Sequence, residues 1–183
     1  MGWFLLVAAT LAAPSQGAPL GQEIERLPDL IKAGRWTEAS ALARSIEARI
    51  ANLAPLEVLD GQALREPALG LGIYERLDGG VVHREELFLY AQIRNHGLQA
   101  KKNGFELVLV SDLIILDATG KELARDEGFG QSRFTARAEH RDTFVNIALR
   151  VKGLPSGKYT ARLVVHDRIK GSSGRIEIPF AMP

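Results

Sequence analysis

Short runs in which apolar and polar residues alternate fill the chain from residue 67 to its C-terminal end. Successive side chains of a β-strand point to opposite faces of a sheet, so this alternation is typical of strands with one buried face. Turn residues separate the runs at intervals of roughly ten positions, as in an all-β sandwich or barrel. We therefore predict a mainly β fold, an antiparallel β-sandwich of about seven or eight strands over residues 67–183, with strands near residues 69–76, 86–95, 105–116, 121–126, 131–136, 142–151, 158–167 and 175–181.

Turn-forming residues mark the boundaries between these strands. Asn103-Gly104 and Asp78-Gly79-Gly80 favour tight turns, because glycine and asparagine accept backbone angles that other residues avoid. Pro179 lies inside the last predicted strand and has no N–H to give to a neighbouring strand. That strand is therefore predicted to lie at the edge of its sheet.

The alternation also predicts which side chains form the core. One face of each strand carries the larger number of aliphatic residues, and this face is expected to point inward. The predicted core residues are Leu87, Leu89, Ala91, Ile93, Val145, Ile147, Leu149, Val151, Tyr159, Ala161, Leu163, Val165, Ile176, Ile178 and Phe180.

Residues 19–54 have a different pattern, which predicts a helical hairpin. Apolar residues recur there with the 3.6-residue period of an amphipathic helix. We expect Thr37 to be the N-cap of the second helix and Gly34 to end the first, which contains Pro28. Residues 55–66 are then expected to form a linker. The apolar stripe of the second helix consists of Ala39, Leu42, Ala43, Ile46, Ile50 and Leu53.

Three aromatic residues, Phe88, Tyr90 and Phe144, fall on the outward face of the predicted sandwich. A sheet face open to water would leave their rings exposed, so another part of the chain is expected to cover them. The helical hairpin is the nearest candidate for this cover.

The first 17 residues are predicted to form a secretory signal peptide. Residues 3–13 are uncharged and largely apolar, and small or helix-breaking residues follow them. Cleavage is expected after Gly17, with Ala18 as the alternative, and the chain is expected to be exported to the periplasm or the extracellular space. No Lys or Arg precedes the apolar run, so an N-terminal helix buried in the fold is the alternative. No later run is long enough to predict a membrane-spanning segment in the mature protein.

Charge and cysteine content exclude several classes of function. The 23 Lys and Arg residues balance 22 Asp and Glu residues, which leaves no basic excess for binding nucleic acid. The chain has no cysteine, so disulfides, thiol nucleophiles and cysteine-based metal sites are excluded.

No local motif predicts a catalytic residue, a cofactor or a metal ligand. The sequence lacks a phosphate-binding loop and a Gly-x-Ser-x-Gly nucleophile motif, and Ser111-Asp112 is interpreted as a bulge or local twist in an apolar strand. A discontinuous site that gathers His140 and His166 with Asp142 or Asp167 remains an alternative. The four histidines stand singly in the sequence and are interpreted as loop or surface residues: His83, His96, His140 and His166.

Two segments resemble known families. Residues 154–159, Leu-Pro-Ser-Gly-Lys-Tyr, resemble the tyrosine corner of immunoglobulin-like sandwiches, which implies that the Tyr159 hydroxyl bonds to the backbone near Leu154 or Pro155. Residues 141–180 more broadly resemble uncharacterised exported bacterial sandwich proteins. Residues 30–39 resemble half of a tetratricopeptide repeat, but no second copy follows at a period of about 34 residues, which favours a single hairpin.

These observations together predict a non-enzymatic exported binding or assembly module that acts through protein–protein contacts. A periplasmic hydrolase or metal-dependent enzyme with a discontinuous loop site is one alternative. A structural accessory of an envelope complex is another. A protein partner is expected, while its identity and the oligomeric state of the chain are left open by the sequence.

Overall fold

The computed structural model of the chain describes residues 18–183. The predicted signal peptide, residues 1–17, lies outside the described residues. The chain divides into two compact units between Arg49 and Ile50, and each unit is considered by itself.

The N-terminal unit contains the two predicted helices, α1 (Leu20–Lys32) and most of α2 (Trp36–Leu53). Gly34 follows α1 with a φ of 69°, the left-handed conformation that commonly ends a helix. An ion pair of 3.0 Å between Arg49 and Glu23 joins the two helices.

Two details of the helical prediction need correction. Thr37 is not the N-cap, because α2 already begins at Trp36 and the Arg35 carbonyl accepts the first hydrogen bond, from the Ala39 N–H. The apolar stripe is only partly buried: Ala39 and Ile46 are buried, whereas Ile50 and Leu53 are exposed. Periodicity alone therefore predicted the face of the helix but not how far along the helix its burial extends.

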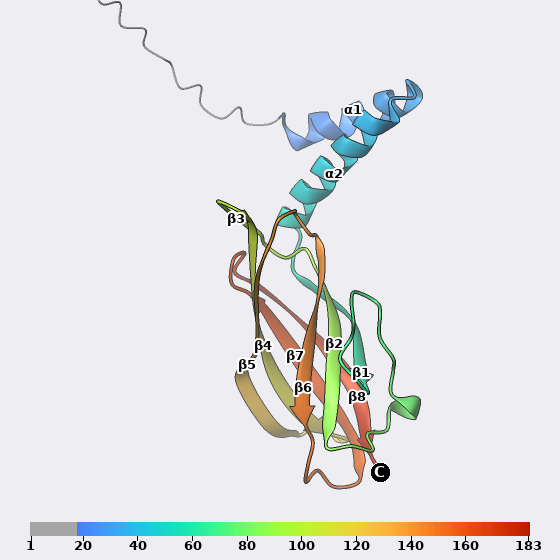
Figure 1. Cartoon of the computed structure of the whole chain (residues 1–183), viewed down its shortest axis with the longest axis vertical. Helices are drawn as coiled ribbons and strands as arrows, with labels where there is room; N and C mark the ends of the chain where they lie inside the picture. The colour runs from blue at the N-terminus through green and yellow to red at the C-terminus, as the bar shows by residue number, and fades with distance from the viewer. Residues whose placement is uncertain (1–17) are drawn as a thin grey trace, which may run out of the picture. The chain divides into compact units, whose positions relative to one another are not determined.

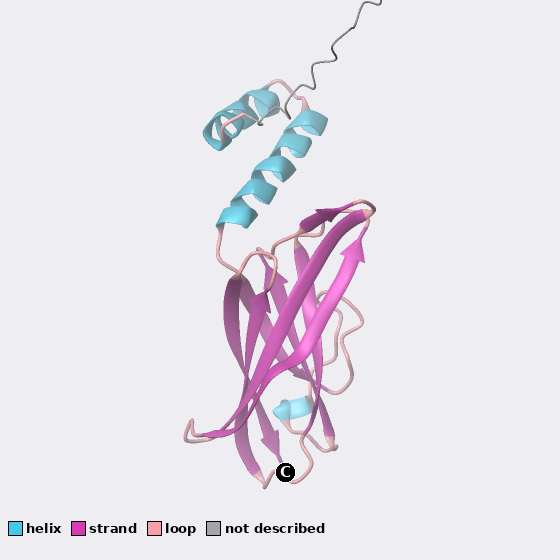
Figure 2. Cartoon of the chain, turned by 90° about the vertical axis from the view of Figure 1, so that its left-hand side faces the viewer, coloured by secondary structure: helices cyan, strands magenta, loops and turns pink. Residues whose placement is uncertain are grey.

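The second unit is a β-sandwich of eight strands in two antiparallel sheets, which confirms the predicted fold class (Figures 1 and 2). The smaller sheet has the order β1-β2-β6, and its strands are β1 (Glu57–Leu64), β2 (Glu86–Arg94) and β6 (Asp142–Arg150). In the larger sheet, β4 pairs with β5 along one side and with β3 and β7 along the other, and β8 follows β7. Its strands are β3 (Gln99–Lys101), β4 (Gly104–Asp117), β5 (Glu122–Ala136), β7 (Gly157–Asp167) and β8 (Ser172–Met182).

The strand boundaries differ from the prediction in three places. Residues 57–64, expected to be part of a linker, form β1, and residues 69–76 form a loop instead of a strand. The two strands predicted over residues 121–126 and 131–136 are one long strand, β5, which continues past a bulge at Gly128. Gly128 has a φ of 68°, so a turn-like residue lies within the strand without ending it.

The core lies between the two sheets and is formed by the face that the alternation predicted. Leu87, Leu89 and Ile93 of β2 are fully buried against Ala161 and Leu163 of β7 in one apolar cluster. Leu149 and Ile176 pack against the same cluster and are partly buried. The inward face was therefore predicted correctly for β2, β6, β7 and β8.

The loop between β1 and β2 covers the outward aromatic residues. Tyr90 is fully buried, with its ring centroid 4.7 Å from that of Tyr74 and 5.6 Å from that of Phe144. Its hydroxyl accepts a hydrogen bond of 3.0 Å from the Gly72 N–H. Tyr90 is thus covered by a loop of its own unit, whereas the helical hairpin had been predicted as its cover. Among the described residues, no helix is both long and apolar enough to cross a membrane.

Candidate functional site

The four histidines do not assemble into one site. His83 and His140 are exposed, His96 is buried, and His166 bonds to Asp112. Within residues 18–183, no three His, Asp or Glu side chains gather in a way that could hold a metal ion. The alternative site of His140 and His166 with Asp142 or Asp167 is therefore not present as a metal cluster in this part of the chain.

The pair of Asp112 and His166 stabilises the bulge in β5. The Asp112 carboxylate accepts hydrogen bonds from the Gly128 N–H at 2.8 Å and from His166 Nε2 at 2.7 Å. Partial burial would raise the pKa of this carboxyl, but the bonds from Gly128 and His166 outweigh it and hold the pKa below its usual range. The pairing register between β4 and β5 shifts opposite Asp112, and the extra residues lie in β5. The bulge or local twist had been predicted in β4 itself, which pairs with β7 through Ser111 and Asp112 without a shift. The pair is thus explained by its structural role.

Asp167 and His96 form a buried polar cluster at the end of β7. Asp167 accepts hydrogen bonds from three backbone N–H groups, those of Gly97 at 2.5 Å, Ile169 at 2.8 Å and Lys170 at 3.0 Å. His96 is 1% exposed, and its Nε2 has no hydrogen-bond partner among the described residues. Burial lowers the pKa of His96 and keeps the imidazole neutral. The carboxylate is fully used in holding two loops together.

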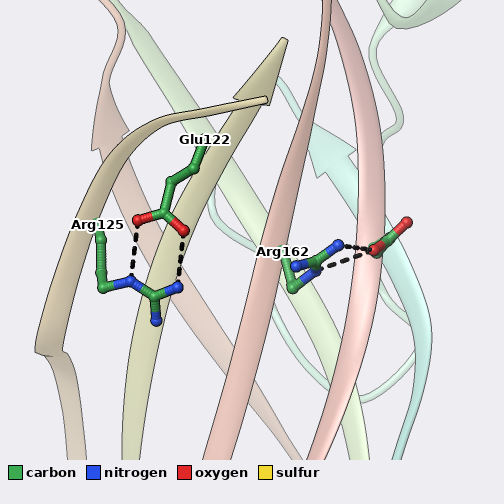
Figure 3. A network of polar contacts seen from close by, with 4 residues as sticks. Glu122, Arg125 and Arg162 are labelled. Atoms are coloured by element: carbon green, nitrogen blue, oxygen red, sulfur yellow. Dashed lines mark hydrogen bonds and ion pairs between the residues drawn. The ribbon is translucent and has the colours of Figure 1, made fainter. Parts of the chain in front are cut away.

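An open cleft of about 620 Å³ lies on the outer face of the larger sheet, beside the turn between β4 and β5. Arg162 projects into it from β7 and bonds to Glu177 of β8 at 2.7 Å. On the same face, Arg125 makes two bonds to Glu122, at 2.9 and 2.7 Å (Figure 3). A carboxylate already neutralises each guanidinium in this network. The two arginines therefore provide no excess positive charge for an anionic ligand.

The two arginines also cover apolar surface. Ile114 of β4 lies directly between Arg125 of β5 and Arg162 of β7 in the strand register, and it is only 3% exposed. Arginine stems commonly shield a neighbouring apolar side chain while the charged head stays in water. We therefore interpret this network as a polar layer that shields the outer face of the larger sheet from water.

The free edge of β6 has a different character. β6 pairs with β2 over nine consecutive residues without a register shift, and it has no second partner strand among residues 18–183 (Figure 1). Its backbone N–H and C=O groups along that edge are therefore available for pairing. Only its two end residues, Asp142 and Arg150, are charged, and it contains no proline.

The other sheet edges carry features that discourage pairing. β5 is interrupted by the bulge at Gly128 and bears several charges, and β8 contains Pro179. The pairing register of β1 is interrupted at Asp60 and Gly61. At this point β1 lies so close to β8 that a Cβ at Gly61 would be 2.8 Å from Ile178. Bulges, charges and prolines are the usual means by which proteins protect sheet edges. β6 has none of them in its central seven residues and is the candidate functional site.

The sequence pattern predicted β6 as a strand but not as an edge strand. The uncharged stretch from Thr143 to Leu149 was a usable signal, since edge strands exposed to water usually carry charge along their length. This stretch could be recognised as an unprotected edge only once β6 was known to pair with β2 alone.

No protein family model and no curated protein matches the chain. Among solved structures, the chain is similar to a crystal structure of a protein from Bordetella pertussis provisionally named ApaA. The two share 13% sequence identity over 70% of this chain and 96% of that chain, with a TM-score of 0.32.

Proposed function

We propose that the chain is a non-enzymatic exported binding module that acts through protein–protein contacts at the free edge of β6. The unprotected edge is the observation that carries the proposal. A strand edge offers a row of alternating N–H and C=O groups, and only another extended backbone can match that row. The partner is therefore a protein that adds a strand to the smaller sheet.

The remaining surfaces support the same proposal. The carboxylates of Asp112 and Asp167 are committed to structural hydrogen bonds, and the arginines of the outer cleft are paired with glutamates. Neither carboxylate can therefore act as a general base without giving up a structural hydrogen bond.

The immunoglobulin-like class of the sandwich belongs to this proposal as well. It is supported by the hydrogen bond of 2.7 Å that the Tyr159 hydroxyl donates to the Pro155 carbonyl, the contact implied by the resemblance to a tyrosine corner. Such sandwiches commonly bind partners through their loops and edges.

Site-specific photocrosslinking tests the interface. A benzophenone amino acid placed at Ala148, an exposed residue of β6, should give a covalent adduct with a protein when cells producing the chain are irradiated. The same amino acid at Ser173, an exposed residue of β8, is the matched control and should give none. Absence of an adduct from Ala148, or equal adducts from both positions, would contradict the proposal.

Export is tested separately by the N-terminus of the product. If residues 1–17 act as a signal peptide, the chain recovered from the periplasm or medium of a bacterial host should begin at Ala18 or Pro19. N-terminal sequencing decides this, and a cytoplasmic product that retains Met1 would contradict export.

A further inference from the structure

We infer that the strand that pairs with β6 is β6 of a second copy of the chain, in a symmetric dimer with Asn146 at its centre. This inference rests on the proposed function and names its partner. Residues directly opposite each other point to the same face of a sheet. A twofold axis perpendicular to the sheet must therefore run midway between the two copies of one β6 residue. Inward-facing residues of one copy then lie opposite inward-facing residues of the other.

Charge selects one of these positions. Asp142 and Arg150, the only charged residues of β6, lie at its two ends and are equally distant from Asn146. An axis at Asn146 places Asp142 of each copy opposite Arg150 of the other. If the axis moves by one residue in either direction, one of the two charged residues faces an uncharged residue of the second copy. The other then has no residue of the strand opposite it. Opposite charges in facing positions stabilise strand pairs, so the centred register is favoured.

The neighbouring strand extends this complementarity. Within one copy, Arg94 of β2 lies opposite Asp142, with 3.4 Å between Arg94 Nε and Asp142 Oδ1, and Glu86 lies opposite Arg150. In the dimer each end of the joined sheet would carry a row of four charges that alternate in sign across four strands. The row runs from Arg94 and Asp142 of one copy to Arg150 and Glu86 of the other.

The residues between the charged ends also match. On the inward face, Val145 would face Ile147 of the second copy, which continues the buried rows of the core. On the outward face, the partly buried Phe144 would face the small side chain of Ala148. At the axis, the Asn146 side chain is occupied by hydrogen bonds with the Ala68 N–H at 3.1 Å and the Ala68 carbonyl at 2.9 Å. Its oxygen and one of its two N–H groups are thus already bonded within the same copy.

Charge reversal tests this arrangement by sedimentation velocity on the full chain. We expect the wild type to sediment as a dimer at micromolar concentration. Asp142→Arg alone and Arg150→Asp alone should each weaken dimerisation about tenfold or more, because both ion pairs then become repulsive. An equimolar mixture of the two variants should dimerise again, since each copy then faces an opposite charge at both ends. Asp126→Arg, a reversal on the exposed edge strand β5, is the matched control and should sediment as the wild type does.

A cysteine experiment gives an independent readout, because the chain contains no cysteine of its own. Mixing an Asp142→Cys variant with an Arg150→Cys variant should give a disulfide-linked dimer under mild oxidation. Either variant alone should remain largely unlinked. A wild type that stays monomeric at about 100 μM, where a dimer with a Kd of about 10 μM would be largely assembled, would overturn the inference. So would a mixture that fails to recover. If Ala148 nevertheless crosslinks to a protein of a different mass, the proposed function survives and the second copy is excluded.

Discussion

At the scale of single residues, the polar groups of Tyr159 and Asp167 each hold a loop of the sandwich in place. Tyr159 illustrates this, since its ring stacks on Phe180 at a centroid distance of 5.5 Å while its hydroxyl donates to the Pro155 carbonyl. The ring contributes apolar burial, and the hydroxyl fixes the loop that enters β7. These two contributions can be separated by removing the oxygen alone.

Tyr159→Phe is expected to lower the free energy of unfolding by about 0.5 to 1.5 kcal/mol, the usual net value of one neutral hydrogen bond. The ring and its stacking on Phe180 remain, so the loss reports the hydroxyl. Denaturant unfolding of the wild type and the variant measures it. Equal stabilities would mean that the bond to Pro155 contributes nothing in solution.

His96 makes the stability of the sandwich depend on pH. Burial lowers the pKa of its imidazole, while the hydrogen bond with the Gly97 carbonyl and the charge of Asp167 only partly oppose this effect. In the unfolded chain the same group titrates near its usual value of about 6.5. Between the two pKa values the unfolded chain binds more protons, so stability falls as the pH drops through about 6.5 towards the lower, folded value.

The pH dependence should therefore be steeper in the wild type than in His96→Gln, which cannot take up the proton. The slope attributable to His96 is at most about 1.4 kcal/mol for each pH unit. Unfolding free energies at pH 7.5, 6.5 and 5.5 give the comparison. Parallel curves for the two proteins would show that His96 does not contribute in this range.

At the scale of secondary-structure elements, tight turns determine how the strands meet. The Asn103-Gly104 turn was predicted from sequence, and it joins β3 to β4 with Lys101 opposite Gly104. Gly104 has a φ of 144°, and a Cβ at this position would lie 2.1 Å from the Ala136 carbonyl oxygen of β5. The glycine is thus required both by its backbone angle and by the close approach of another strand.

Gly104→Ala is expected to destabilise the sandwich by about 1 to 3 kcal/mol, the usual cost of a strained backbone conformation. Lys102→Ala, in the same turn and exposed, should change stability by less than about 0.5 kcal/mol. Thermal or denaturant unfolding of both variants tests this. A Gly104→Ala variant as stable as Lys102→Ala would show that β5 moves away from the turn without cost.

The same scale shows what sequence could and could not predict. Alternation identified β2, β6 and β7 with their inward faces, because each is a regular strand with one face in the core. β1 was missed because Asp60 and Gly61 interrupt its alternation where the register shifts. Residues 69–76 were mistaken for a strand because Leu69 and Ile73 fall in an alternating run, although Leu69 is 90% exposed. The edge position of β6 could not be predicted, since it depends on pairing between segments about 50 residues apart.

At the scale of the whole molecule, both apolar clusters of the sandwich consist of residues of the second unit. The main core cluster is formed by residues between Leu56 and Met182, and the smaller cluster around Tyr90 is completed by the loop between β1 and β2. Lys170 donates hydrogen bonds to the carbonyls of Ala51 at 2.8 Å and Asn95 at 3.0 Å, and also to that of Ala54. The last turn of α2 is therefore held by a charged donor, which suits the negative end of a helix.

A fragment of residues 50–183 should consequently fold by itself. We expect a single cooperative unfolding transition and no binding of a hydrophobic dye, because Tyr90 and the core keep their cover. Fluorescence with such a dye and denaturant unfolding of the fragment and of the chain lacking only residues 1–17 make the comparison. Tyr90→Ala in the fragment is the positive control, since it opens a cavity under the covering loop and should cost about 3 to 5 kcal/mol, the usual loss for a large buried aromatic side chain. Strong dye binding by the unaltered fragment would show that residues 18–49 complete the apolar surface of the sandwich.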